Sequence, residues 1–330
     1  MEKSNKPIIK HIPQFLEYCE VEKGLSPISS KNYHNFLKVF INWLKDNKLT
    51  ELKPQELTPD HIWDYRLYLS RKKDYKGQYL KKTSQSYYLR ALRNLLNYFT
   101  NKDIISLPSE KIKLPKLTEK DKAIKFLNFN QVESLLEMPD TAKTDGLRDR
   151  AILETLFSTG MRVSELTSLN VTQINVKKLM NNKFADQELS ISGKGGRVRT
   201  VYFSRRCLSW LTKYLKTRKD LFPPLFINYR PSKDTRDERR LTPRSIEVLV
   251  KKYTMMAGLP VAATPHTLRH SYATDLLEQG ADIRAVQELL GHQDIGTTQI
   301  YTHVTDKRLR DIYRNFHSGN KGSSGQTPRY

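Results

Sequence analysis

The chain has 330 residues, with 57 lysines and arginines against 35 aspartates and glutamates, which gives a formal net charge of +22 at pH 7. At roughly 150 residues per domain the length predicts about two domains, and 38% hydrophobic residues suit packed cores rather than a disordered chain. No run approaches the about 18 apolar residues of a membrane helix, and the N-terminus is charged, which argues against a membrane partner and against secretion.

The positive charge extends over the whole chain. Residues 1–120 carry 23 basic and 13 acidic side chains, and residues 121–330 carry 34 and 22. Two basic halves favour contact of both with nucleic acid, while charge that only keeps the protein soluble is the alternative. Cys19 and Cys207 lack metal or disulfide spacing, so we interpret them as buried apolar side chains of a cytoplasmic protein.

The first third of the chain has the periodicity of helices. Ser26-Pro27 and Thr58-Pro59 each offer an N-cap followed by proline at the first helical position. Apolar stripes follow at three- and four-residue steps, and a further helix is expected around residues 9–18. The stripes are formed by Phe36, Leu37, Phe40 and Leu44, by Ile62, Tyr65 and Leu69, and by Leu89, Leu92, Leu96 and Phe99. Residues 1–115 therefore predict a bundle of about four helices.

The other faces of these predicted helices are basic. We expect them to contact DNA phosphates, and a merely solvated basic surface is the alternative. The candidate DNA-binding residues are Lys72, Lys73, Lys81, Lys82, Arg90 and Arg93.

Residues 107–125 are rich in lysine, contain two prolines and lack a helical stripe. We interpret the segment as an extended linker, with residues 116–125 as the basic connection between the two domains. Such a linker can lie across a phosphate backbone while the domains clamp opposite sides of a duplex.

Residues 126–317 predict a second, mostly helical domain with one β-hairpin. Strands at 187–192 and 197–203 flank Gly193-Lys194-Gly195-Gly196, so a lysine lies on a glycine turn that can approach a ligand closely. Helices are expected to start at residues 242, 264 and 282. Residues 318–330 are expected to be disordered. The predicted fold class is mainly α with a small β-sheet.

A capped helix start is predicted by the segment Thr264-Pro265-His266-Thr267-Leu268-Arg269-His270. His266 and Arg269 share one face of the first turn, where free N–H groups and the helix dipole favour an anion such as phosphate. A purely structural helix and a metal site of His266 and His270 are the alternatives. Against metal, threonine replaces the general-base glutamate at position 267, and Arg269 adds a neighbouring cation.

Three further segments accompany this helix: Gly160-Met161-Arg162-Val163-Ser164-Glu165-Leu166, Leu290-Gly291-His292, and residues 297–303 around Tyr301. With the hairpin lysine and His-x-Leu-Arg-His, they resemble the tyrosine recombinase (phage integrase) family, most closely Xer-type site-specific recombinases. The resemblance covers the whole second domain, and residues 1–115 also resemble the family's core-binding domain.

The resemblance implies a role for each matching residue. Two arginines hold the scissile phosphate, tyrosine is the nucleophile, the hairpin lysine is the acid for the leaving 5′ oxygen, and two histidines help to activate tyrosine and to bind phosphate. The implied catalytic set is Arg162, Lys194, His266, Arg269, His292 and Tyr301. Glu165 matches the acidic residue that supports Arg162, and its alternative is an ion pair with a surface lysine.

The resemblance also implies an activity: cofactor-free recombination through a 3′-phosphotyrosyl intermediate and a Holliday junction. The expected partners are duplex DNA with an inverted-repeat site, a homo-tetramer on two sites, and an accessory protein or partner recombinase. The stripe of Leu309, Ile312 and Phe316 would dock on a neighbouring protomer or fold back on its own domain. Resolution of chromosome or plasmid multimers is favoured over element integration. Type IB topoisomerase, inactive DNA-binding protein and metal nuclease are the rival functions.

Overall fold

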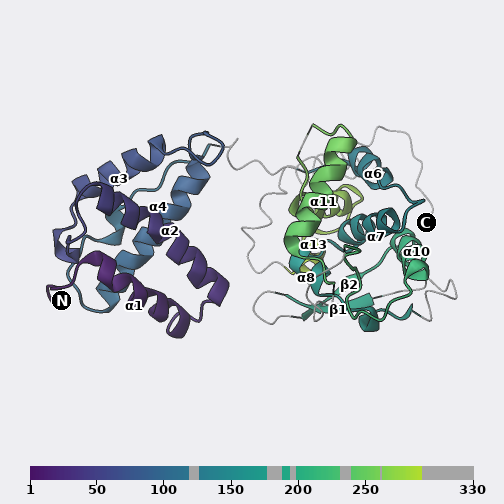
Figure 1. Ribbon diagram of the computed structural model, residues 1–330, viewed down its shortest axis with the longest axis horizontal. Helices are drawn as coiled ribbons and strands as arrows, with labels where there is room; N and C mark the ends of the chain where they lie inside the picture. The colour runs from purple at the N-terminus through teal and green to yellow at the C-terminus, as the bar shows by residue number, and fades with distance from the viewer. Residues whose placement is uncertain (119–125, 177–187, 194–197, 231–238, 261, 292–330) are drawn as a thin grey trace, which may run out of the picture. The chain divides into compact units, whose positions relative to one another are not determined.

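The computed structural model describes residues 1–118, 126–176, 188–193, 198–230, 239–260 and 262–291. The chain divides into two compact units, Met1–Ala123 and Ile124–Tyr330, and Figure 1 shows the elements of each. Within the described residues the fold is mostly helical with one two-stranded sheet, which confirms the predicted fold class. Cys19 and Cys207 are free and buried, as expected.

The described residues of the first unit form four α-helices: α1 (Ile8–Val21), α2 (Pro27–Asp46), α3 (Pro59–Arg71) and α4 (Lys82–Asn101). The predicted N-caps are confirmed, because the Ser26 hydroxyl accepts from the backbone N–H of Ser29 and the Thr58 hydroxyl accepts from that of His61. One short 3-10 turn, η1 (Pro54–Glu56), lies between α2 and α3. The start signals therefore fix where these helices begin.

The core of the first unit forms around α4, which packs against α1, α2 and α3. Leu92, Leu96 and Phe99 on α4 are fully buried, and the Tyr65 ring of α3 meets Phe40 of α2 edge-on with centroids 4.9 Å apart. Each such apolar side chain contributes about 1.5–3 kcal/mol when it leaves water. The apolar stripes therefore hold the bundle together.

The segment after α4 differs from the expected extended linker. It forms a 3-10 turn, η2 (Ser109–Lys111), and Ile112 is fully buried in the core of the first unit, with Leu107 and Leu114 packed beside it. The expectation was wrong here because one isoleucine between lysines leaves no periodic pattern. The boundary between the two units falls inside residues 116–125.

The second unit is built around α7 (Thr144–Thr159), which contacts α6 (Phe129–Glu137), α10 (Arg205–Thr217) and α12 (Pro265–Glu278). Its remaining described elements are α8 (Val163–Ser168), η3 (Val171–Gln173), β1 (Glu188–Ser192), β2 (Val198–Tyr202), α11 (Pro243–Met256) and α13 (Ile283–Leu290). The residues that cap α11, α12 and α13 are Thr242, Thr264 and Asp282, which confirms those predicted starts.

Strands β1 and β2 form an antiparallel pair in which Ile191 lies opposite Arg199 and Leu189 opposite Val201. Ile191 and Val201 are buried. Because directly opposed residues share a face of the sheet, Arg199 lies on the face that is turned to the core. Figure 1 shows this hairpin beside α8 and α13 at one end of the second unit. The predicted strands are confirmed, and the turn residues 194–197 lie outside the described residues.

Across the part of the chain that the structure describes, no helix is both long and apolar enough to cross a membrane.

Candidate active site

Arg162 follows the end of α7, where Gly160 adopts a left-handed conformation with φ of 57°. Its backbone N–H donates to Glu165 Oε2 at 2.7 Å, and its Nη1 donates to Glu165 Oε1 at 3.0 Å. The Arg162 side chain is 35% exposed, whereas that of Glu165 is 6% exposed. Glu165 thus caps α8 and orients a guanidinium that still faces solvent.

Arg199 binds the same carboxylate from the hairpin. Its Nη1 donates to Glu165 Oε1 at 2.9 Å and its Nη2 to Oε2 at 2.7 Å. Burial alone would raise the pKa of Glu165, but the hydrogen bonds from Arg199 and Arg162 outweigh it and hold the pKa below its usual range. Glu165 therefore stays charged between two arginines, which replaces the alternative of a surface lysine partner.

Arg269 lies on α12 and is 4% exposed. Its Nη1 donates to the Gly160 carbonyl and its Nη2 to the Leu290 carbonyl, both at 2.6 Å. These bonds join the end of α7 and the end of α13 to the first turns of α12. Arg269 is therefore anchored to the short segment, residues 160–162, that carries Arg162.

His266 occupies the first turn of α12 and is exposed. Its Nε2 lies 2.8 Å from Nε2 of the buried His270, with the rings nearly perpendicular. Partial burial, with the positive charges of Arg269 and Arg162, lowers the pKa of His266. A neutral imidazole at this position can accept a proton.

The site is strongly electropositive. Two guanidinium groups, of Arg162 and Arg199, bind the carboxylate of Glu165, and Arg269 adds a third positive charge beside the Gly160 carbonyl. The N-terminal end of α12 adds its dipole and its free N–H groups. This arrangement can hold a phosphate and stabilise charge that develops on its oxygens.

The remaining predicted site residues, Lys194, His292, Tyr301, Leu309, Ile312 and Phe316, lie outside the described residues. For Lys194 and His292, the structure does bring the preceding residue to this site. A Cβ placed on Gly193 would lie 3.4 Å from Arg199 Nη1, and one on Gly291 would lie 2.9 Å from Arg199 Cδ. Gly193 directly precedes Lys194, and Gly291 directly precedes His292.

Sequence reasoning missed Arg199 and considered His270 only as a metal ligand. The signal for Arg199 was available, because alternation places Arg199 and Val201 on the same face of β2. The metal alternative predicts that His266 and His270 converge on an ion. Instead, their nitrogens are the two ends of one hydrogen bond. No group of three or more metal-ligating His, Cys, Asp or Glu residues occurs within the described ranges.

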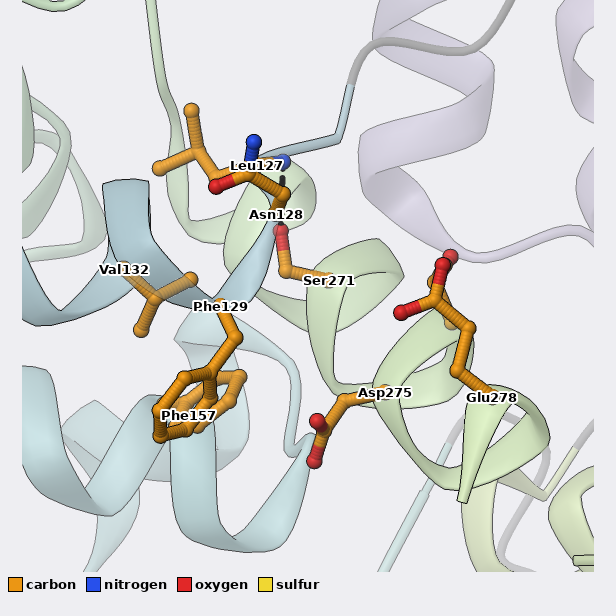
Figure 2. Close-up of a pocket in the computed structure, with 9 residues that line it drawn as sticks. Leu127, Asn128, Phe129, Val132, Phe157, Ser271, Asp275 and Glu278 are labelled. Carbon is orange, nitrogen blue, oxygen red and sulfur yellow. Dashed lines mark hydrogen bonds between the residues drawn. The ribbon is translucent and has the colours of Figure 1, made fainter. Parts of the chain in front are cut away.

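A hollow on the other side of α12 is separate from this site. Figure 2 shows the carboxylates of Asp275 and Glu278 across from the rings of Phe129 and Phe157, with the Leu127 N–H donating to Ser271 Oγ at 2.8 Å. Burial, and then the charge of Glu278, raises the pKa of Asp275. An acidic lining repels phosphate, so this hollow does not extend the candidate active site.

The six candidate DNA-binding residues lie on or between α3 and α4. Lys72 donates to the Tyr68 hydroxyl at 2.9 Å, and Lys73 lies over the ring of Tyr79. Lys81 and Lys82 are exposed at the start of α4, and Arg90 is exposed further along it. Arg93 is half-buried, and its buried Nε has no hydrogen-bond partner within the described residues. Four of the six candidates are therefore exposed to an external ligand, and Lys72 and Arg93 only in part.

Comparison with known proteins gives matches along both units. Residues 125–308 match the model of the phage integrase family, and residues 12–106 match that of the phage integrase N-terminal SAM-like domain. The chain is 36% identical over 313 residues to tyrosine recombinase XerD of Lacticaseibacillus casei, covering 93% of this chain and 98% of that protein. It is 35% identical over 316 residues to tyrosine recombinase XerC of Pelobacter propionicus, covering 94% and 96%.

A solved structure shares the fold. XerH site-specific recombinase bound to a palindromic difH substrate aligns with a TM-score of 0.70 at 21% identity, covering 95% of this chain and 98% of that one.

Proposed function

The chain belongs to the phage integrase family and is a Xer-type tyrosine recombinase, and on this premise we propose that it cleaves and rejoins duplex DNA at a specific site without a cofactor. The observation that carries the proposal is that Arg269 binds the Gly160 carbonyl, two residues before Arg162, while the positive charges of both arginines lower the pKa of His266 on the first turn of α12. These groups suit the phosphate of a DNA strand.

In the proposed reaction, the hydroxyl oxygen of Tyr301 attacks the scissile phosphorus and the bond to the 5′ oxygen breaks. His266 accepts the tyrosine proton, and Lys194 donates one to the leaving oxygen. Arg162, Arg269 and His292 stabilise the charge on the non-bridging oxygens, as metal ions do elsewhere. The 3′-phosphotyrosyl bond keeps the energy of the phosphodiester, so a 5′ hydroxyl from another strand can reseal it.

A suicide substrate tests this reaction directly. DNA nicked near the cleavage point should trap the wild-type protein as a covalent adduct, because the short 5′ fragment diffuses away before it can reseal the strand. Tyr301→Phe should bind the same DNA and form no adduct, since only the attacking oxygen is lost. EDTA should leave trapping unchanged. An adduct formed by the phenylalanine variant would place the nucleophile elsewhere.

The first unit is proposed to bind DNA through Lys72, Lys73, Lys81, Lys82, Arg90 and Arg93. Lys81 and Lys82 stand at the start of α4, whose first turn has no acidic residue. Positive charge is unfavourable at the positive end of a helix dipole. A phosphate at this position would remove that repulsion, which supports an external anion rather than a purely solvated face.

The proposed assembly is a tetramer on two inverted-repeat sites that exchanges strands through a Holliday junction. The stripe of Leu309, Ile312 and Phe316 is proposed to dock on a neighbouring protomer. Truncation after Thr305 should leave binding to one half-site intact but impair cooperative binding to a full site, as measured by gel shift. It should also impair recombination, as measured by product formation. Full cooperativity in that variant would show that the segment does not act between protomers.

We propose a cytoplasmic role in resolving chromosome or plasmid multimers, and the match to tyrosine recombinases XerD and XerC over more than nine-tenths of the chain supports its recombinase part. Recombination between two directly repeated copies of the target site on one plasmid tests this role. Relaxation of supercoiled DNA that lacks any such site would instead indicate a topoisomerase.

A further inference from the structure

We propose that Arg199 is a positioning residue of the active site: through Glu165 it sets the orientation and effective charge of Arg162, and its side chain holds the backbone that leads into Lys194 and His292. This inference rests on the proposed function of those residues in phosphate cleavage.

Arg199 occupies an unusual place in the hairpin. It lies opposite Ile191 in the strand register, on the face that also carries the buried Val201. Its side chain is only 9% exposed. A buried guanidinium needs hydrogen bonds and an opposite charge to offset its lost hydration, and Arg199 has both.

Its hydrogen bonds join three separate elements. From β2, two nitrogens bind the two oxygens of Glu165 on α8, and Nε donates to the Leu289 carbonyl near the end of α13 at 3.1 Å. The planar guanidinium fixes these three directions together. Arg199 therefore sets the distance between the hairpin, the Arg162 turn and the end of α13.

The two glycines beside Arg199 extend this effect to the catalytic residues. A Cβ on Gly193 would lie 3.4 Å from Arg199 Nη1 and 3.6 Å from Arg162 Nη1. Gly291 has φ of +64°, and its Cβ would lie 2.9 Å from Arg199 Cδ. The backbone at Gly291 therefore approaches Arg199 more closely than a side chain would comfortably allow, whereas a Cβ on Gly193 would be in ordinary contact with Arg199. Lys194 and His292 are the next residues along the chain.

Arg199 also sets the charge available to phosphate. Glu165 is shared between two arginines, so the three groups together carry one net positive charge. Without Arg199, the carboxylate would pair with Arg162 alone, and the net charge would fall to zero. Arg162 would then be a weaker partner for phosphate, even if the fold were unchanged.

The test measures single-turnover cleavage of the nicked substrate at saturating DNA, alongside DNA affinity and thermal unfolding. Arg199→Met should slow cleavage about 10- to 100-fold and leave affinity within about threefold, because phosphate contacts elsewhere dominate binding. Arg199→Lys keeps the positive charge but loses the paired donors of the planar guanidinium. Its cleavage rate should therefore lie between those of the methionine variant and wild type.

Arg150→Met is the matched control. Arg150 is 7% exposed and pairs with Glu154 at 2.8 Å, but its partners lie on α6, α7 and α10 rather than around Arg162. The Arg150→Met variant should have lower thermal stability. Its cleavage rate should stay within about twofold of wild type at a temperature where the protein is folded.

A double variant separates charge from structure. Arg199→Met with Glu165→Gln restores one net positive charge, so it should cleave faster than Arg199→Met alone. The inference is overturned if both Arg199 variants cleave at the wild-type rate, if Arg150→Met slows cleavage equally, or if the double variant is slower than the single one. Absence of any adduct with the wild-type protein would instead reject the proposed function.

Discussion

The two units of this protein hold positive charge in opposite ways. In the second unit, Arg269 and Arg199 are buried and fixed by carbonyls and by Glu165. In the first unit, Lys73 and Lys82 are exposed, and Lys73 lies against a tyrosine ring. Fixed charges suit transition-state stabilisation, which depends on direction. Exposed charges suit binding to a polyanion, which depends on the number of neutralised phosphates.

Stability alone does not account for the fixed charges. Replacing a buried ion pair by apolar groups is often neutral or stabilising, whereas removing one partner costs about 3–5 kcal/mol. The cluster of Arg162, Glu165 and Arg199 is therefore better understood as a functional arrangement that the surrounding core supports. The comparison predicts that changes in the two units will affect different measurements.

The largest expected effect follows from removing Arg269. Arg269→Ala should lower single-turnover cleavage about 10²- to 10³-fold, because a preorganised donor to the transition state is lost. The salt dependence of DNA binding should stay close to that of wild type. Arg269→Lys, with thermal unfolding measured in parallel, controls for the lost carbonyl contacts. Near-normal cleavage by both variants would contradict the assigned role.

The next effect is on affinity. Changing Lys72, Lys73, Lys81 and Lys82 to Gln should reduce the slope of log K against log salt by up to about 3.6, at about 0.9 per phosphate contact. Cleavage at saturating DNA should not change. The same four positions changed to Arg keep their charge and should keep the slope. An unchanged slope in the Gln variant would show that these lysines do not contact DNA phosphates and serve only to keep the protein soluble.

A smaller effect concerns two glycines with nearly equal φ. Gly24 in the first unit has φ of +60° and nothing within 4 Å of an added Cβ, whereas at Gly160, with φ of +57°, that Cβ would collide with the ring of Tyr272. Gly24→Ala should cost about 1–2 kcal/mol from backbone strain. Gly160→Ala should cost about 1–3 kcal/mol more from overpacking. Urea unfolding measures both, and equal costs would contradict the packing at Gly160.

The smallest effect is on pH dependence. Burial lowers the pKa of both His11 and His266, aided by Lys6 in the first unit and by Arg269 and Arg162 in the second. As pH falls below about 6.5, the unfolded chain takes up these protons first, so stability should decline there and be unaffected above. His266→Asn should weaken the pH dependence of the thermal unfolding midpoint between pH 7.5 and 5.5. If the midpoint of the variant falls with pH as steeply as that of wild type, the loss of stability comes from other groups.

Helix starts were predictable from local chemistry. Thr58-Pro59, Thr242-Pro243 and Thr264-Pro265 each cap a helix as expected, because an N-cap and a following proline act within one turn. Helix α7 has no comparable signal. Its residues 149–157 are buried on every side, so no apolar stripe marks it.

Local chemistry predicted only the anion site of His266 and Arg269, and the rest of the candidate site came from the resemblance. Arg162 and Arg269 lie 107 positions apart, and no periodicity reveals that Arg269 binds the Gly160 carbonyl, two residues before Arg162. Arg199 was not predicted because the glycine turn of the hairpin does not indicate which strand side chains point inward. Ile112 was overlooked because its burial depends on contacts with distant helices.

The anchoring of Ile112 shortens the connection between the two units. Leu114 still packs on the first core and Leu127 is already buried in the second, so thirteen residue steps join them and span at most about 45 Å. Once one unit has bound DNA, a tether this short holds the other at an effective local concentration in the millimolar range. On the proposed function, we expect even a weak second contact to be occupied almost continuously, so that the two units release DNA together rather than singly.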